Sequence, residues 1–117
     1  MKKIFSALII FTAVLCAAFP AFAEIIDDTS TGQYCGENLR WKYDTETKTL
    51  TISGTGAIKD YDYQLTSMQA PWVKHSKTQD LEKVEISEGV TGIGEYAFYY
   101  CSSLKSVTLP DSLKTIG

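Results

Sequence analysis

The sequence has little of what catalytic, metal and nucleic-acid sites are made from. It contains one histidine, His75, and three cysteines, Cys16, Cys35 and Cys101, with no C-x-x-C pair among them. Such a set lacks the ligand spacing of a zinc site, so we expect no metal and no cofactor. The chain also has no run of basic residues, which leaves no electrostatic route to nucleic acid or to an anionic membrane.

Catalysis finds little support among the remaining polar residues. His75 lies in the polar stretch PWVKHSK; it could act as a base for Cys35 or Cys101, but a solvated surface histidine is the simpler interpretation. No two carboxylates stand out as a glycosidase pair. Asp60 and Asp62 alternate with tyrosines, but a calcium loop needs further ligands and a turn glycine. We therefore predict a protein that is not an enzyme and has no catalytic residues.

Only one long apolar run is present, and it lies at the N-terminus. Two lysines open the chain, the run extends from Ile4 to Phe19, and Ala-Phe-Ala ends at Ala23. This pattern predicts a secretory signal, residues 1–23, removed after Ala23; the run is shorter than the roughly 20 residues of a membrane-spanning helix. The remaining nine basic and fourteen acidic residues give a formal charge of −5. We expect a secreted or cell-surface protein without membrane contact after signal removal.

The clearest pattern is a repeat with an offset of 23 residues: LEKVEISEGVTGIG (81–94) aligns with LKSVTLPDSLKTIG (104–117). The apolar positions are kept and the polar ones vary. A period of roughly 20 to 30 residues with the form L-x-x-V-x-I/L is the signature of a leucine-rich repeat, in which each unit supplies a strand. The residues predicted to form its core are Leu81, Val84, Ile86, Val90, Ile93, Ala97, Phe98, Cys101, Leu104, Val107 and Leu109.

The stretch between the two copies predicts a short helical turn that returns the chain to the next strand. Ala97, Phe98 and Cys101 are spaced three and four apart, as on one face of a helix, and the tyrosines lie on the other side. Cys101 then points inward as a small apolar group. A disulfide to Cys35 is the alternative that export would permit; it would close a long loop and stabilise by about 4 kcal/mol.

The pattern L-x-x-V-x-I…V-x-x-I-G-x-x-A-F-x-x-C-x-x-L resembles the BspA-type leucine-rich repeat of bacterial surface proteins, over residues 81–117. The stretch CGENLRWKYDTETKTLTISGTGAIKDY, followed by APW, is similar to the segment that often precedes such arrays. The resemblance implies a secreted or surface-displayed, non-catalytic protein that binds host or neighbour-cell ligands. Two departures stand out: Gly89 replaces the asparagine of the better-known repeat, and Tyr100 stands where a small residue more often precedes the cysteine.

The N-terminal half predicts a β-hairpin followed by a short helix. Residues 38–43 and 49–53 alternate between apolar and polar side chains, and Pro71 suits a first helical position. The predicted fold is mainly β: a loose lead-in (24–37) that is too polar to bury, an N-terminal hairpin cap (38–80) and a short, incomplete leucine-rich-repeat solenoid (81–117), with one complete and one truncated repeat. A coil needs neighbours on both faces, and the truncated copy leaves an open strand edge. We expect further repeats or self-association there.

The predicted function is adhesion or recognition of protein or glycan ligands on other cells or matrix. Two alternatives stay open: a targeting or binding module at the N-terminus of a larger secreted enzyme, and a truncated product without function. Two surfaces are candidates for ligand binding. The outward positions of the repeat strands form the first: Glu82, Lys83, Glu85, Lys105, Ser106 and Thr108. The tyrosines of the return path form the second: Tyr96, Tyr99 and Tyr100.

Overall fold

The computed structural model describes residues 24–75 and 78–117, and the predicted signal, with Cys16, lies outside this part. Its strands are β1 (Ile25–Asp27), β2 (Asn38–Asp44), β3 (Thr49–Ala57), β4 (Lys83–Ile86), β5 (Val90–Ile93), β6 (Ser106–Thr108) and β7 (Thr115–Ile116). Its helices are short: α1 (Asp28–Thr31), η2 (Thr66–Met68) and α2 (Pro71–Lys74). The prediction of a mainly β fold is confirmed. Among the described residues, no helix has the length and apolar character to cross a membrane.

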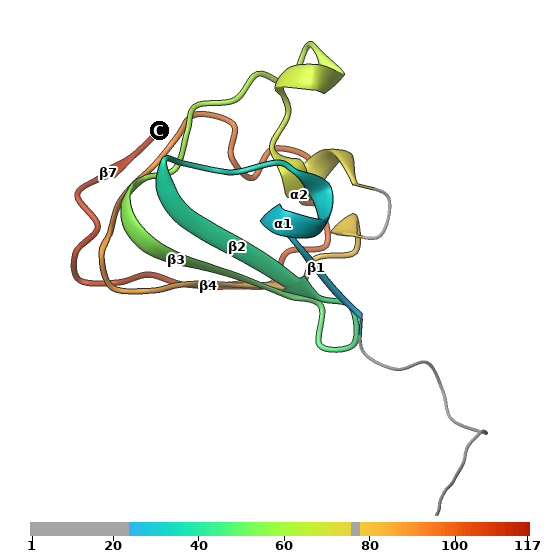
Figure 1. Cartoon of the computed structure of the whole chain (residues 1–117), viewed down its shortest axis with the longest axis horizontal. Helices are drawn as coiled ribbons and strands as arrows, with labels where there is room; N and C mark the ends of the chain where they lie inside the picture. Colours follow the sequence, from blue (N-terminus) through green and yellow to red (C-terminus); the bar gives the residue numbers. More distant parts are fainter. Residues whose placement is uncertain (1–23, 76–77) are drawn as a thin grey trace, which may run out of the picture.

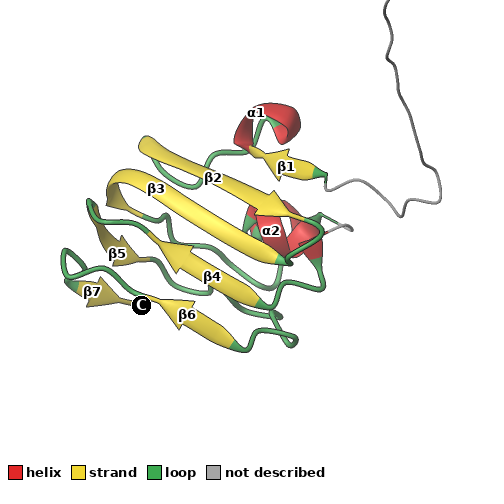
Figure 2. Ribbon diagram, turned by 90° about the horizontal axis from the view of Figure 1, so that it is seen from below, coloured by secondary structure: helices red, strands yellow, loops and turns green. Residues whose placement is uncertain are grey.

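The strands form one sheet that divides at β3. One branch has the order β1-β2-β3-β4-β6, and in the other β5 pairs with β3 and β7 pairs with β5 (Figure 2). β1, β2 and β3 pair antiparallel, whereas every pair from β3 onward is parallel. The 23-residue offset appears directly in the register, where Val84 lies opposite Val107 and Ile93 opposite Ile116. Figure 1 shows β4 at the base of a coil whose chain returns past α2.

The corner between β4 and β5 depends on a glycine. Gly89 has φ +106°, and a Cβ built on it would lie 2.4 Å from the carbonyl oxygen of Gly54 in β3. No other residue type combines that backbone conformation with so close an approach. In the second copy Ser112 occupies the same position; its hydroxyl accepts from Gly89 N (3.0 Å) and donates to the carbonyl of Val90 (2.8 Å).

The lead-in differs from the prediction of a segment too polar to bury. β1 pairs with β2, with Ile26 opposite Tyr43, and α1 follows at once. Asp28 is wholly buried. The reason is a partner twelve residues away: the Arg40 guanidinium donates to both carboxylate oxygens of Asp28, at 2.7 and 2.8 Å.

Trp72 of α2 joins the N-terminal half to the first repeat. Its ring packs edge-on against Trp41 (centroids 5.8 Å apart) and stacks on Phe98 (5.7 Å, 24° between planes). The indole N–H donates to the carbonyl of Ala97 at 2.8 Å. Both tryptophans are buried, so the two segments share one core.

Most of the predicted repeat core lies inside this cluster. Six of its residues are buried: Leu81, Val84, Ile86, Val90, Ile93 and Ala97. Phe98, Cys101 and Leu104 are partly buried against them. Val107 and Leu109 differ from the prediction, since their side chains are 41% and 47% exposed. Within the described residues β6 has a neighbouring strand on one side only, and so little covers them.

The return path between β5 and β6 is a series of turns rather than the predicted helical turn. Most of its hydrogen bonds join residues three apart, as from Ala97 N to the Gly94 carbonyl. Tyr96 and Tyr100 have φ of +56° and +69°, and residues in this left-handed region end a right-handed helix. Cys35 and Cys101 are free thiols. Burial raises the pKa of Cys35 to about 12 and that of Cys101 to about 11.

Candidate binding face

The outer face of the sheet carries two rows of mainly polar side chains that run across five strands. Directly opposed residues on neighbouring strands point to the same side, and the residues between them, such as Leu50 and Val84, are buried. The register therefore defines the rows. The first is Ile25, Asp44, Thr49, Lys83 and Ser106, and the second is Asp27, Lys42, Thr51, Glu85 and Thr108.

The centre of each row is a threonine between opposite charges, and the order of charges reverses from one row to the next. Thr49 stands between Asp44 and Lys83. Thr51 stands between Lys42 and Glu85. Lysine donates hydrogen bonds, carboxylates accept them and hydroxyls do both. The face thus offers alternating donors and acceptors with no net charge across these four charged groups.

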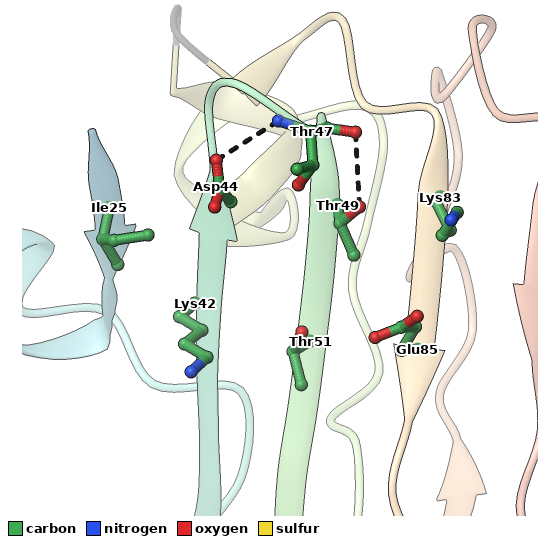
Figure 3. Close-up of a pocket in the computed structure, with 8 residues that line it drawn as sticks. All are labelled: Ile25, Lys42, Asp44, Thr47, Thr49, Thr51, Lys83 and Glu85. Atoms are coloured by element: carbon green, nitrogen blue, oxygen red, sulfur yellow. Dashed lines mark hydrogen bonds between the residues drawn. The ribbon is translucent and has the colours of Figure 1, made fainter. Parts of the chain in front are cut away.

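A shallow groove of about 370 Å³ lies over this centre (Figure 3). Figure 3 shows the threonines of β3 and its turn between the charged side chains of β2 and β4. Local hydrogen bonds hold the turn. Among them, Thr47 N donates to the Asp44 carboxylate (3.2 Å), and the Thr49 hydroxyl donates to the Thr47 carbonyl (3.3 Å). The full lining is Ile25, Lys42, Asp44, Thr47, Thr49, Thr51, Lys83 and Glu85.

The structure brings together part of the predicted strand surface. Lys83 and Glu85 line the groove, and Ser106 and Thr108 continue the same face on β6. Glu82 and Lys105 do not line the groove; their charged groups lie 3.7 Å apart in an ion pair just before β4 and β6. Sequence reasoning missed the hairpin side chains of the groove. Their alternation predicts an outward face, but only the parallel pairing of β3 with β4 places them beside the repeat.

The ion pair belongs to a line of alternating charges at one end of the strands. The Tyr43 hydroxyl donates to the Asp80 carboxylate at 2.5 Å. Lys48, in the hairpin turn, lies 3.7 Å from Asp80 and 3.8 Å from Glu82. Burial and the neighbouring carboxylates raise the pKa of Tyr43. The line ties the hairpin to both repeats, but such exposed pairs stabilise a protein only modestly.

The tyrosines of the second predicted surface also lie together. Tyr96 packs against Tyr99 (centroids 5.4 Å apart), and Tyr99 packs against Tyr100 (4.4 Å). Tyr63, from the segment between β3 and α2, joins them and was missed by sequence reasoning. No sequence signal links it to the return path, 33 residues away. In the described part of the chain, no group of three or more His, Cys, Asp or Glu residues could hold a metal ion.

Comparisons with known proteins agree with this architecture. Residues 74–117 match the family model of the BspA type leucine rich repeat region (6 copies). Among solved structures, a leucine-rich repeat protein from Eubacterium ventriosum is similar, with 28% sequence identity and a TM-score of 0.64. The match covers 80% of this chain and 22% of that one, so this chain spans about a fifth of its length. No curated protein matches. Residues 74–117 therefore resemble a BspA-type leucine-rich repeat region, and this similarity suggests a protein-interaction repeat module.

Proposed function

We propose that the protein is an exported, non-enzymatic recognition protein that holds an extended ligand on the outer face of its sheet. The observation that carries the proposal is the pair of polar rows, which continue without interruption from the hairpin into the repeats. A binding face on rigid strands is held more precisely than one on loops. The hairpin half is then more than a cap, because it supplies most of the groove lining.

The chemistry of the groove supports an oligosaccharide of another cell or of its matrix. Each sugar hydroxyl both donates and accepts a hydrogen bond, as the threonine hydroxyls do. Lys42 and Lys83 supply donors, and Asp44 and Glu85 supply acceptors. The balanced charges around Thr49 and Thr51 suit a neutral chain better than a strongly acidic or basic one. A peptide of a neighbour-cell protein is the second ligand class that this face would accept.

The test is a binding screen of the purified protein against arrayed bacterial and host glycans and matrix proteins. We expect at least one ligand to be bound by the native protein and lost on the combined replacement Lys42→Ala, Thr51→Ala and Glu85→Ala. These positions point outward, so the variant should fold normally.

A matched variant controls for the loss of the same side-chain types elsewhere. Lys59→Ala, Thr55→Ala and Glu37→Ala remove one residue of each kind at exposed positions outside the groove. It should bind as the native protein does. Equal binding by the groove variant and the control variant would show that the ligand lies elsewhere, and the proposal would be wrong.

A further inference from the structure

We propose that four tyrosines form a second interaction surface, which binds arginine side chains of a partner protein. This tyrosine patch consists of Tyr63, Tyr96, Tyr99 and Tyr100. It shares no residue with the groove on the sheet, since three of its members come from the return path after β5 and the fourth from the segment between β3 and α2. That segment projects at the top of Figure 1, in yellow-green.

The rings contact one another and leave much of their surface exposed. Tyr63 lies 5.0 Å from Tyr96 and 4.7 Å from Tyr99, measured between ring centroids. Tyr96, Tyr99 and Tyr100 are nevertheless 45%, 40% and 63% exposed. A cluster of exposed aromatic rings of this size is uncommon unless it meets a partner, and tyrosine is favoured at interfaces because it adds contact area with few rotatable bonds.

Two of the tyrosines occupy backbone positions that favour a small residue. Tyr96 and Tyr100 have φ of +56° and +69°, where glycine or asparagine is held at less cost than a bulky aromatic residue. Tyr100 is also the departure from the repeat pattern noted in the sequence. Tyr96 and Tyr100 therefore stand at positions where a smaller side chain would favour stability. Strained residues of this kind gather at functional sites, so we infer that the rings serve binding.

The charges around the tyrosine patch favour a cationic partner. Residues 60–70 and 94–103, which carry the patch, contain Asp60, Asp62 and Glu95 and no basic residue of their own; Lys74 of α2 reaches the first segment, where its Nζ donates to the Ser67 carbonyl at 3.4 Å. Two of these acids directly precede Tyr63 and Tyr96 in the chain. The two segments also meet here, because Glu95 N donates to the Asp60 carboxylate at 2.8 Å. Aromatic faces attract cations, and the carboxylates add to that attraction.

The ring geometry favours a guanidinium over a sugar. The ring planes are inclined to one another by 40° to 84°. Rings at such angles present their faces in several directions, whereas a pyranose stacks on a flat platform. Arginine can stack on one ring and direct its N–H groups to a carboxylate at the same time. A protein that presents exposed arginines therefore fits the tyrosine patch.

The first experiment measures binding of a synthetic decapeptide of alternating arginine and serine by calorimetry. Its control peptide has citrulline in place of arginine, which keeps the shape and removes the charge. We expect the arginine peptide to bind and the citrulline peptide not to bind. Tyr99→Leu should weaken binding about two- to five-fold. Asp62→Asn should weaken it measurably, whereas Glu46→Gln, which removes the same charge from the hairpin turn, should not.

A second pair of variants separates binding from folding. Tyr100→Asn should weaken binding of the arginine peptide. The midpoint of thermal unfolding should stay the same or rise, because asparagine suits the left-handed backbone. Tyr100→Phe should retain binding, because the ring and not the hydroxyl attracts the cation. Equal binding of both peptides would overturn the proposal. So would equal losses in Asp62→Asn and Glu46→Gln, which would mean diffuse attraction to an acidic protein. Binding of a neutral oligosaccharide that depends on Tyr99 would assign the surface to glycans instead.

Discussion

Replacing Arg40 with methionine is expected to lower the free energy of unfolding by about 3 kcal/mol at pH 7. The Asp28 carboxylate is wholly buried and accepts three N–H groups, two from Arg40 at 2.7 and 2.8 Å and one from Trp41 N at 3.1 Å. Arg40 itself is 59% exposed, so methionine loses little packing. The variant instead leaves a buried carboxylate with a single N–H partner. For a domain of this size, a loss of 1 kcal/mol lowers the melting temperature by roughly 4 to 8 °C.

The pH dependence distinguishes this cause from lost packing. Hydrogen bonds from Arg40 hold the pKa of Asp28 below its ordinary range. The native pair therefore stabilises the protein above the ordinary pKa of an aspartate, about 4, and this contribution is lost as the pH falls through the lower folded value. In Arg40→Met the unpaired carboxyl favours its protonated form, so its pKa is raised. The difference in stability between the two proteins should shrink as the pH falls from 7 to 3.

Urea unfolding followed by tryptophan fluorescence measures both stabilities across this range. The double variant Asp28→Asn with Arg40→Met is the control. It should lose less stability at pH 7 than Arg40→Met alone, because no charge is left buried. A loss for Arg40→Met below about 0.5 kcal/mol would mean that the pair acts as an ordinary exposed ion pair. A larger loss that does not change with pH would refute the role of the carboxylate.

Two substitutions and one labelling experiment test other parts of the fold. Gly89→Ala should lower the free energy of unfolding, measured by chemical unfolding, by at least about 2 kcal/mol. The reason is that φ is +106° at this residue and the new Cβ would meet the Gly54 carbonyl. An unchanged unfolding midpoint would refute this close approach. Trp72→Phe keeps the stacking but leaves the Ala97 carbonyl unpaired, which should cost about 1–3 kcal/mol in the same assay. Burial raises the pKa of Cys35 to about 12, so iodoacetamide should react with it far faster in urea than in the native state at pH 8.5; equal rates would contradict its burial. Because that pKa is raised on folding, stability should also fall as the pH rises above about 9.

Much of the fold could be predicted because its signals are local or periodic. The alternation of residues 38–43 and 49–53 predicts two strands, and both form, with β3 running on to Ala57. The 23-residue repeat predicts one strand in each unit; β4 and β6 are those strands, and the structure adds that they pair parallel with Val84 opposite Val107. Apolar spacing of this kind is the strongest structural signal in a single sequence.

The structural features that could not be predicted from the sequence depend on contacts between residues far apart in the chain. The polarity of the lead-in suggested an exposed segment, but Asp28 is buried because Arg40 neutralises it. Side-chain alternation identifies the outward face of a strand but not its neighbour. The groove could therefore not be predicted from the sequence, because it depends on the register that places Thr49 beside Lys83. Tyr63 lies in an irregular segment, where periodicity carries no information about packing.

We propose that the ligand binds in the groove across β2, β3 and β4. The most direct test is an amide chemical-shift map of the purified protein, titrated with a ligand found in the binding screen. The largest changes are expected on Lys42, Thr49, Thr51, Lys83 and Glu85, in a continuous band across the three strands. Changes confined to the return path, residues 95–103, with the groove amides unmoved, would contradict the proposal.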